Sequence, residues 1–346
     1  MKKWILIWVC LVPLFAIAQA PTGYYDDAEG LTGSALKTAL HNIISTGYTI
    51  TVYDDLWDVY PITDKKSNGK VWDMYSDIPG GTPPYEFTFV TDQCGNYNSE
   101  GDCYNREHSV PQSWFGGSLP MYSDMFHVVP TDGKVNGQRS NFPFGEVSSA
   151  SWTSQNGSKL GPCGFPGYTG TVFEPIDSFK GDFARIYFYM CVRYKDEMPS
   201  WSGESFSGGD LSSWTENMLL QWHALDSVST KEIERNNDVY GIQHNRNPFV
   251  DNPDWVYSIW GPTSGLENGF QQIVSIFPNP ADNNISIRYA TSERPEHVYL
   301  CDLQGRVITE EITENLIETG HLPEGFYFLK FIFKSGITEK EFVIMH

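Results

Sequence analysis

Hydrophobic positions recur at helical spacing in three stretches of the chain, and each predicts a helix with a buried face: residues 34–44, 183–194 and 214–226. Ser34 is the expected N-cap of the first helix, because its hydroxyl can accept a hydrogen bond from a free backbone N–H group there. Two further stretches have different patterns. Residues 85–90 (YEFTFV) predict a strand, whereas residues 148–182 are rich in Gly, Ser and Pro and predict loops.

Beyond residue 273, apolar and polar side chains alternate with the period of β-strands, and residues 326–333 (FYFLKFIF) form a further predicted strand. The stretch before it, residues 262–272, is polar and Gly-rich and predicts a linker. We therefore expect a larger domain over residues 19–261 and a small all-β sandwich over residues 273–346.

The first residues, 1–18, predict a cleaved signal peptide. Lys2 and Lys3 precede an apolar run that is too short to span a membrane, and Ala16 and Ala18 form a small-x-small cleavage site. An uncleaved buried helix is the alternative. No later stretch is apolar enough to cross a bilayer, so the mature protein is expected in the medium or on the cell surface.

Five cysteines remain after cleavage, and in an exported chain pairing is the default expectation. Cys94 and Cys103 bracket a Gly/Asn-rich loop and are expected to form a disulfide. Cys163 and Cys191 are the second expected pair, which leaves Cys301 free. Because no Cys-x-x-Cys motif occurs, a structural zinc site is not expected.

A polar constellation lies in the middle of the chain. Glu107 and His108 are adjacent on a predicted strand, and a helix predicted over residues 132–140 carries Asn136 and Arg139. If this helix crosses the strand, Asn136 comes close to Glu107 despite the distance between them in sequence. On a regular strand, Glu107 and His108 point to opposite faces. If both serve one site, either the strand is bent or bulged there, or His108 reaches the site from the edge.

These residue types suit metal-assisted hydrolysis of a phosphodiester. Carboxylate and amide oxygens are ligands for a hard divalent cation, which keeps waters and accepts phosphate oxygens. An imidazole can take a proton from the attacking water, and Arg139 can contact phosphate. The spacing alone is weak support, since Glu-His pairs and Asn-Gly turns are common. Asn141 is the alternative ligand and His127 the alternative base.

The same region resembles the endonuclease I family, secreted nucleases with a ββα-metal motif. The matching pieces are Asn105 to His108 (NREH), Asp124 to Pro130 (DMFHVVP), Thr131 to Gly133 (TDG), Val135 to Gly137 (VNG) and Arg139 to Phe142 (RSNF). The resemblance implies an α+β fold, with a ββα-metal core in mostly helical surroundings. It also implies that His108 is the general base and that Glu107 and Asn136 ligate the metal. Phe126 departs from the pattern, because family members often carry Asp-Leu-His there.

The C-terminal region is similar to the sorting domain of the type IX secretion system. The matching pieces are Phe277 to Ala281 (FPNPA), Asp302 to Arg306 (DLQGR) and Leu322 to Tyr327 (LPEGFY). The resemblance implies an export signal that is recognised by the type IX machinery. A small carbohydrate-binding or adhesive sandwich is the alternative.

The expected protein is thus an exported, monomeric endonuclease that cleaves DNA without strong sequence specificity, with RNA left open. The expected cofactor is Mg²⁺, or another divalent cation such as Ca²⁺ or Mn²⁺. A formal charge of −20 is unfavourable for binding phosphates, although residues 104–147 carry three basic and four acidic side chains, a net of only −1. Two other functions are considered: a catalytically silent surface adhesin on a nuclease fold, and a phosphoesterase for small substrates.

Overall fold

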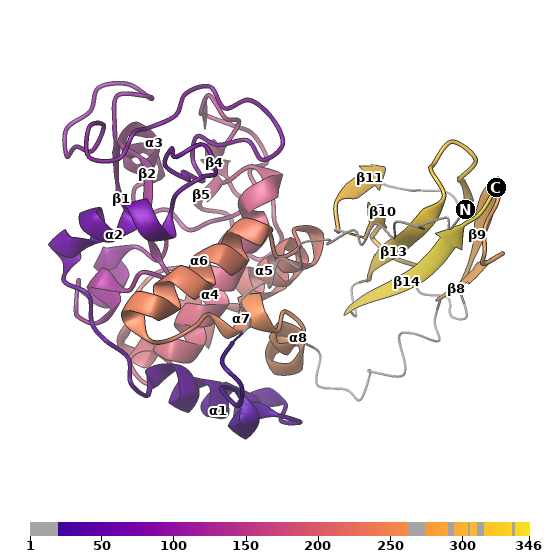
Figure 1. Ribbon diagram of the computed structural model, residues 1–346, viewed down its shortest axis with the longest axis horizontal. Coiled ribbons are helices and arrows are strands. Elements are labelled where there is room, and N and C mark those ends of the chain that lie inside the picture. The colour runs from indigo at the N-terminus through magenta and orange to yellow at the C-terminus, as the bar shows by residue number, and fades with distance from the viewer. Residues whose placement is uncertain (1–19, 262–273, 290–293, 304, 310–314, 334–335) are drawn as a thin grey trace, which may run out of the picture.

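The computed structural model describes residues 20–261, 274–289, 294–303, 305–309, 315–333 and 336–346. The predicted signal peptide and linker lie outside these ranges. Figure 1 shows a helix-rich unit on one side and a unit of β-strands on the other. Each unit has its own cluster of buried hydrophobic side chains. None of the described helices is long and apolar enough to cross a membrane.

Eight α-helices are described in the first unit. They are α1 (Gly33–Ser45), α2 (Leu56–Thr63), α3 (Gly133–Arg139), α4 (Lys180–Arg193), α5 (Ser213–Leu225), α6 (Thr230–Gln243), α7 (Pro248–Asp251) and α8 (Trp255–Trp260). All three helices predicted from hydrophobic spacing are confirmed as α1, α4 and α5. The N-cap prediction is wrong: α1 begins one residue before Ser34, and Thr32 occupies the N-cap position.

Helix α4 is the centre of this unit. All of its residues are buried, and α1, α5 and α7 pack against it. Figure 1 places α4 in the middle of the unit, with α1 below it and α3 above it. A helix buried on every side belongs to the interior of a domain, so α4 is the core element on which the other helices are arranged.

Small antiparallel sheets lie at the edge of the helices. They comprise β1 (Tyr104–His108) with β2 (Val128–Asp132), β3 (Trp152–Thr153) with β4 (Lys159–Pro162) and β5 (Thr171–Glu174), and β6 (Phe206–Ser207) with β7 (Asp210–Leu211). The prediction that residues 148–182 are all loops is therefore wrong. The three strands found there are two to four residues long, too short for alternation to be visible in the sequence.

The strand predicted over residues 85–90 is also absent from the described structure. Phe87 is buried and its carbonyl accepts a hydrogen bond from the Val71 N–H (3.0 Å), but the chain then turns. Val90 has a positive φ of 67°, and the Asp92 carboxylate accepts a hydrogen bond from the Thr88 N–H (2.6 Å). The aromatic alternation therefore reflects burial of an extended segment that has no continuous partner strand.

The second unit is the expected all-β sandwich. One sheet has the order β11-β10-β13-β14 and the other the order β12-β9-β8. The strands are β8 (Val274–Phe277), β9 (Asn284–Tyr289), β10 (His297–Asp302), β11 (Val307–Thr309), β12 (Leu316–Glu318), β13 (Gly325–Phe333) and β14 (Gly336–Ile344). Alternate side chains of both sheets, among them Ile285, Leu300 and Leu329, form its core.

The cysteines follow the predictions only in part. Cys94 and Cys103 form a disulfide, as expected, and Cys301 is free. The predicted Cys163–Cys191 pair is wrong, because both residues are free. Cys191 lies on the fully buried helix α4, whereas the half-buried Cys163 follows β4 and its thiol donates to the Phe165 carbonyl.

The two separate cores predict that the first unit folds without the second. A chain that ends at Gly261 should give the helical far-UV spectrum and a thermal midpoint within a few degrees of the helical unit in the full protein. Lys330, whose ammonium donates to the Ala224 carbonyl, is a described contact between the units. Replacing it by Ala in the full chain is the matched control. Loss of cooperative unfolding in the shortened chain would contradict independent folding.

Candidate active site

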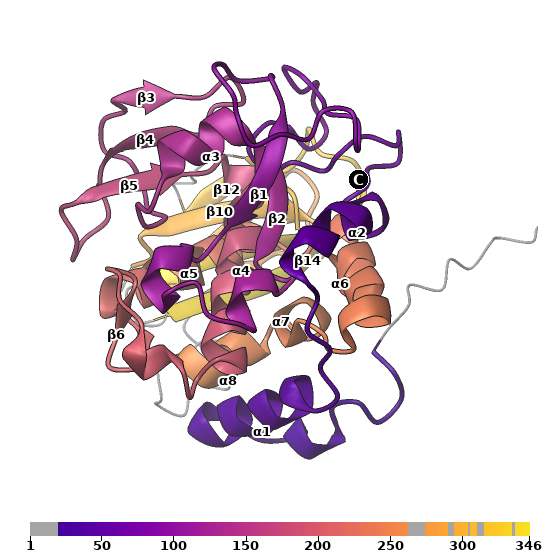
Figure 2. The same cartoon turned by 90° about the vertical axis from the view of Figure 1, so that its left-hand side faces the viewer.

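Strands β1 and β2 and helix α3 form one compact motif, in which the helix follows β2 directly. Tyr104 lies opposite Asp132 and His108 opposite Val128, with no shift of register between them. Figure 2 shows the two strands side by side with α3 next to them. The Asp132 carboxylate caps α3 by accepting a hydrogen bond from the Val135 N–H (2.8 Å). The predicted strand and crossing helix are thus confirmed.

One side of β1 faces α3. Asn105 and Glu107, two residues apart, point to this side, and Asn136 and Arg139 meet them from the helix. Asn136 Nδ2 donates to Asn105 Oδ1 (2.8 Å), and Arg139 Nη1 donates to Glu107 Oε1 (2.8 Å). The structure therefore places both predicted metal ligands, Glu107 and Asn136, on the same side as Arg139.

Arg139 joins the helix to the end of β1. Its guanidinium donates to Glu107, to the His108 carbonyl (2.8 Å) and to the Ser109 carbonyl (2.5 Å), and it lies over the Phe144 ring (4.6 Å). The residue is only 1% exposed. These contacts commit the guanidinium to the protein itself, so they favour an orienting role; the phosphate contact predicted for Arg139 stays a prediction.

Glu107 is a buried carboxylate with partners. It is 2% exposed, and its Oε1 accepts hydrogen bonds from the Tyr75 hydroxyl (2.7 Å) and from Arg139. Burial raises the pKa of Glu107, while the charge of Arg139 and the Tyr75 hydroxyl act in the opposite direction. Removing either member of such a buried pair leaves a charge without compensation, which typically costs about 3–5 kcal/mol.

His108 lies on the other side of β1, and the bend or bulge considered between it and Glu107 is absent from the regular β1–β2 pairing. Its Nε2 is 3.0 Å from the Tyr122 carbonyl. Because a carbonyl only accepts, Nε2 carries the proton and Nδ1 the lone pair. Burial, together with neighbouring His127, lowers the pKa of His108 to about 3, so the ring is neutral at pH 7.

The alternative residues are placed less favourably. His127 is completely buried, with Nε2 bonded to the Met121 carbonyl (2.6 Å), so water does not reach it. Phe126, which departs from the family pattern, is buried against Tyr189 (ring centroids 4.7 Å apart) and has no polar group to offer. Asn141, the alternative ligand, is exposed beyond the end of α3.

Glu107 and Asn136 form a donor set that fits a hard cation. Asn136 uses its Nδ2 for Asn105, which leaves the side-chain oxygen Oδ1 for another partner. Both hydrogen bonds described for Glu107 go to Oε1, and Oε2 takes part in neither. The described ranges contain no group of three or more His, Cys, Asp or Glu side chains that could hold a metal ion. A cation here would depend on waters or substrate for its remaining ligands, as Mg²⁺ commonly does.

The disulfide loop lies against α3, a contact that sequence reasoning missed. A Cβ added at Gly133 would be 2.6 Å from Cδ1 of Tyr97, and one at Gly137 would be 2.2 Å from the Tyr97 hydroxyl. Tyr97 lies between the two cysteines of the bridge. Glycines four residues apart lie on the same face of a helix, and such a pair is the sequence signal for the close approach of another side chain. The Tyr97 ring lies against both glycines and is therefore next to Asn136.

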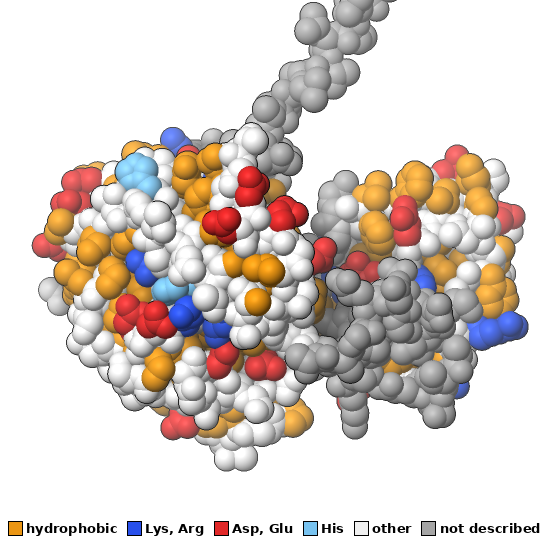
Figure 3. Space-filling view, turned by 90° about the horizontal axis from the view of Figure 1, so that it is seen from below, with side chains coloured by type: hydrophobic (Ala, Val, Ile, Leu, Met, Phe, Trp, Pro, Cys, Tyr) orange, Lys and Arg blue, Asp and Glu red, His pale blue; other side chains and the backbone are white. Residues whose placement is uncertain are grey.

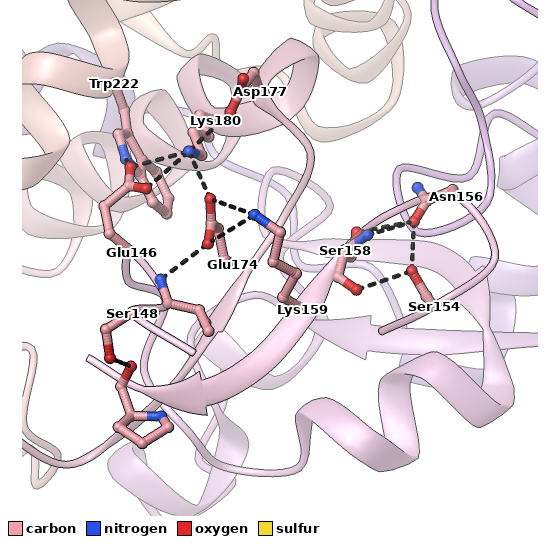
Figure 4. A network of polar contacts seen from close by, with 12 residues as sticks. Glu146, Ser148, Ser154, Asn156, Ser158, Lys159, Glu174, Asp177, Lys180 and Trp222 are labelled. Carbon is pink, nitrogen blue, oxygen red and sulfur yellow. Dashed lines mark hydrogen bonds and ion pairs between the residues drawn. The ribbon is translucent and has the colours of Figure 1, made fainter. Parts of the chain in front are cut away.

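A second group of charges surrounds Lys180 at the start of α4 (Figure 4). Lys180 Nζ is 3.0 Å from both oxygens of Glu146 and 3.0 Å from Glu174, and Trp222 Nε1 donates to Glu146 (2.5 Å). Burial lowers the pKa of Lys180, but the surrounding carboxylates outweigh it and hold the pKa well above its usual range. The network fixes the segment that carries Phe144 and thereby the ring beneath Arg139.

Because Tyr97 lies against the glycines of α3, the loss of stability caused by Gly133→Ala should depend on the Tyr97 ring, and a double-mutant cycle can measure this coupling. Gly133→Ala should destabilise the protein by about 1–3 kcal/mol through overpacking. In a Tyr97→Ala background the same change should cost less than about 0.5 kcal/mol, because the clashing ring is gone. Urea unfolding of the four chains gives both values. Equal costs in the two backgrounds would show that the ring does not rest on the helix.

Comparison with known proteins places this geometry in a family. The Endonuclease I family matches residues 32–254, and the secretion system C-terminal sorting domain matches residues 275–345. The chain is 33% identical over 247 residues to an extracellular ribonuclease of Bacillus subtilis (strain 168), covering 68% of this chain and 78% of the relative. It is 35% identical over 254 residues to an extracellular ribonuclease of Bacillus amyloliquefaciens, with the same coverage.

An extracellular deoxyribonuclease of Aeromonas hydrophila is 27% identical over 165 residues, covering 42% of this chain and 64% of the relative. The family match covers the helix-rich unit from α1 to α7, including β1, β2 and α3, and ends just before α8. The sorting-domain match spans the sandwich, as expected for a secreted protein. The chain therefore belongs to the endonuclease I family and is a secreted nuclease with a C-terminal secretion sorting domain.

Proposed function

We propose that this nuclease is a metal-dependent endonuclease that hydrolyses phosphodiester bonds of DNA and RNA without strong sequence specificity. The observation that carries the proposal is the arrangement at the end of β1. Two oxygen-bearing side chains, Glu107 and Asn136, meet on one side, and a neutral imidazole with a free lone pair, His108, lies next to them in the chain.

Glu107 and Asn136 would hold one divalent cation, Mg²⁺ or a similar ion such as Ca²⁺ or Mn²⁺. When bound, such an ion offsets the negative charge that develops on the phosphate and on the leaving oxygen. Asn105 orients the Asn136 amide, and Arg139 and Tyr75 orient the Glu107 carboxylate. The protein thus sets both ligand oxygens in place before substrate arrives, which is the arrangement that lowers a barrier most effectively.

His108 is the proposed general base. Its Nδ1 takes the proton of a water as the water oxygen forms a bond to phosphorus, and the bond from phosphorus to the leaving oxygen breaks on the opposite side. The Tyr122 carbonyl holds the tautomer that this step needs, because it keeps the ring proton on Nε2. After each turnover the imidazolium releases this proton to solvent, and the ring becomes neutral again.

The names of the relatives support a nucleic-acid substrate of both kinds. Two are extracellular ribonucleases and one is an extracellular deoxyribonuclease, so we propose that both polymers are cut. The charge of −20 argues against tight binding through phosphates alone. On the described part of the face in Figure 3, acidic side chains lie among the Lys and Arg side chains, and no broad basic surface forms.

Activity should require a divalent cation. Excess EDTA should abolish plasmid and RNA cleavage, and added Mg²⁺ should restore it, because the Arg139 guanidinium is already occupied by Glu107 and two backbone carbonyls. In Asn136→Ala the metal concentration for half-maximal activity should rise at least about tenfold, while the matched variant Asn141→Ala should resemble wild type. Full cleavage in EDTA, or a shift in Asn141→Ala alone, would contradict this assignment.

The roles of Glu107 and His108 can be separated. His108→Ala should lower the rate about 10²–10⁴-fold and leave metal affinity near wild type, and added imidazole should restore part of the rate. Glu107→Gln keeps the hydrogen bonds to Tyr75 and Arg139 but loses the charge, so its metal affinity should fall and imidazole should have no effect. Calorimetric titration of both variants checks this. If His108→Ala loses the metal instead, His108 is a ligand and not the base.

A further inference from the structure

A column of stacked side chains adjoins His108. Arg106 and His108 are two residues apart and therefore share the side of β1 that faces away from α3. The Arg106 guanidinium lies 3.7 Å from the ring centroid of Tyr53 and 4.6 Å from that of Trp57. Tyr53 belongs to a short 3-10 helix, η2 (Tyr53–Asp55), and Trp57 to α2, so two elements far from β1 in sequence meet there.

The column continues to the proposed base. The rings of Tyr53 and Tyr122 are 4.2 Å apart, and the imidazole of His108 lies nearly parallel to both, at 5.6 Å and 17° from Tyr53 and at 5.2 Å and 23° from Tyr122. We name Trp57, Arg106, Tyr53 and Tyr122 the aromatic column. Its members extend from α2 to the group that would activate water, with the Arg106 guanidinium over Tyr53 and Trp57 and the Tyr53 and Tyr122 rings tilted by 30°.

The aromatic column lies at the surface. Trp57, Tyr53 and Tyr122 are all half-buried. Exposed apolar residues flank the column in the chain: Val52, before Tyr53, is 61% exposed, and Leu119, three residues before Tyr122, is 59% exposed. Ligand sites combine apolar and aromatic side chains with a few polar groups, and the half-buried rings of the aromatic column offer such a surface beside His108.

The charges nearby do not suit a duplex backbone. Arg106 Nη1 is 3.2 Å from a carboxylate oxygen of Asp54, whose side chain is 86% exposed, and Asp55 and Asp58 are also exposed. Binding of double-stranded nucleic acid depends mainly on neutralising its phosphates. Base stacking on aromatic rings and Arg has no such requirement and is open only to unpaired bases.

We propose that the aromatic column binds an unpaired nucleobase next to the bond to be cut, so that single-stranded nucleic acid is the preferred substrate. The base extends the stack at its half-exposed rings, Trp57 and Tyr122, and the phosphate beside it reaches His108. This inference rests on the proposed function and names the substrate class for the same site. The acidic surface weakens phosphate contacts for both kinds of substrate, and stacking adds affinity that only unpaired bases can gain.

The experiment compares four substrates of equal length with saturating Mg²⁺: single-stranded RNA, single-stranded DNA, the DNA duplex, and a single strand of abasic tetrahydrofuran units. The variants are Trp57→Leu and Tyr122→Leu, with Trp57→Phe and Tyr122→Phe to keep a ring. Replacing the Tyr122 side chain leaves the carbonyl that holds His108 in place. Tyr168→Leu is the matched control, because Tyr168 is also half-buried and stacks on Trp214, outside the site.

Wild type should cut the single strands with the highest kcat/KM. The two Leu variants should lose about tenfold on single-stranded RNA and DNA, mainly through KM, since stacking of this kind contributes at this level per base. On the abasic strand, which has no base to stack, the loss should be clearly smaller than on RNA and DNA, and the Phe variants should retain most activity. An equal loss on all four substrates would overturn the inference and show that the rings only hold His108. No loss on any substrate would overturn it as well. A wild type that cuts nothing with metal would overturn the proposed function itself.

Discussion

The buried guanidinium of Arg139 is the interaction on which the rest of the site depends. It ties α3 to the last residues of β1 by contacting the Glu107 carboxylate and the carbonyls of His108 and Ser109. A charge removed from water is costly unless polar groups surround it, and here three acceptors contact the two Nη atoms of Arg139 and the Phe144 ring lies against the guanidinium. The same residue thereby sets the positions of the proposed ligand and of the backbone at the proposed base.

The regular pairing of β1 divides the site into two sides. Ligand oxygens lie toward α3, and His108 lies toward the aromatic rings of Tyr53 and Tyr122. The proposed ligand Glu107 and the proposed base His108 are the last two residues of the strand. A phosphate that is reached from both sides therefore has to lie at the end of β1. The two sides are also supported by different parts of the chain: the disulfide loop and Tyr97 on one, η2 and α2 on the other.

Two features of the molecule are related to its export, the disulfide and the separate sorting domain. The disulfide between Cys94 and Cys103 closes the loop that rests on α3, so an oxidising environment stabilises the contact with this helix. The sorting sandwich keeps its own core, so that delivery and catalysis are served by separate units. The acidic surface remains compatible with nuclease action if the substrate is held by stacking instead of by phosphate contacts.

The sequence by itself determined the family, the two units, the helices α1, α4 and α5 and the ββα order, because hydrophobic spacing and a continuous polar motif are local properties of the chain. It also identified Glu107, His108, Asn136 and Arg139 as the polar set. It did not reveal α6, which is as long as α4. Only the tertiary structure decided that Arg139 is buried against Glu107, that Cys163 and Cys191 remain apart, and that Tyr97 rests on α3. These facts depend on which segments meet in space, and local patterns do not encode contacts between residues tens of positions apart.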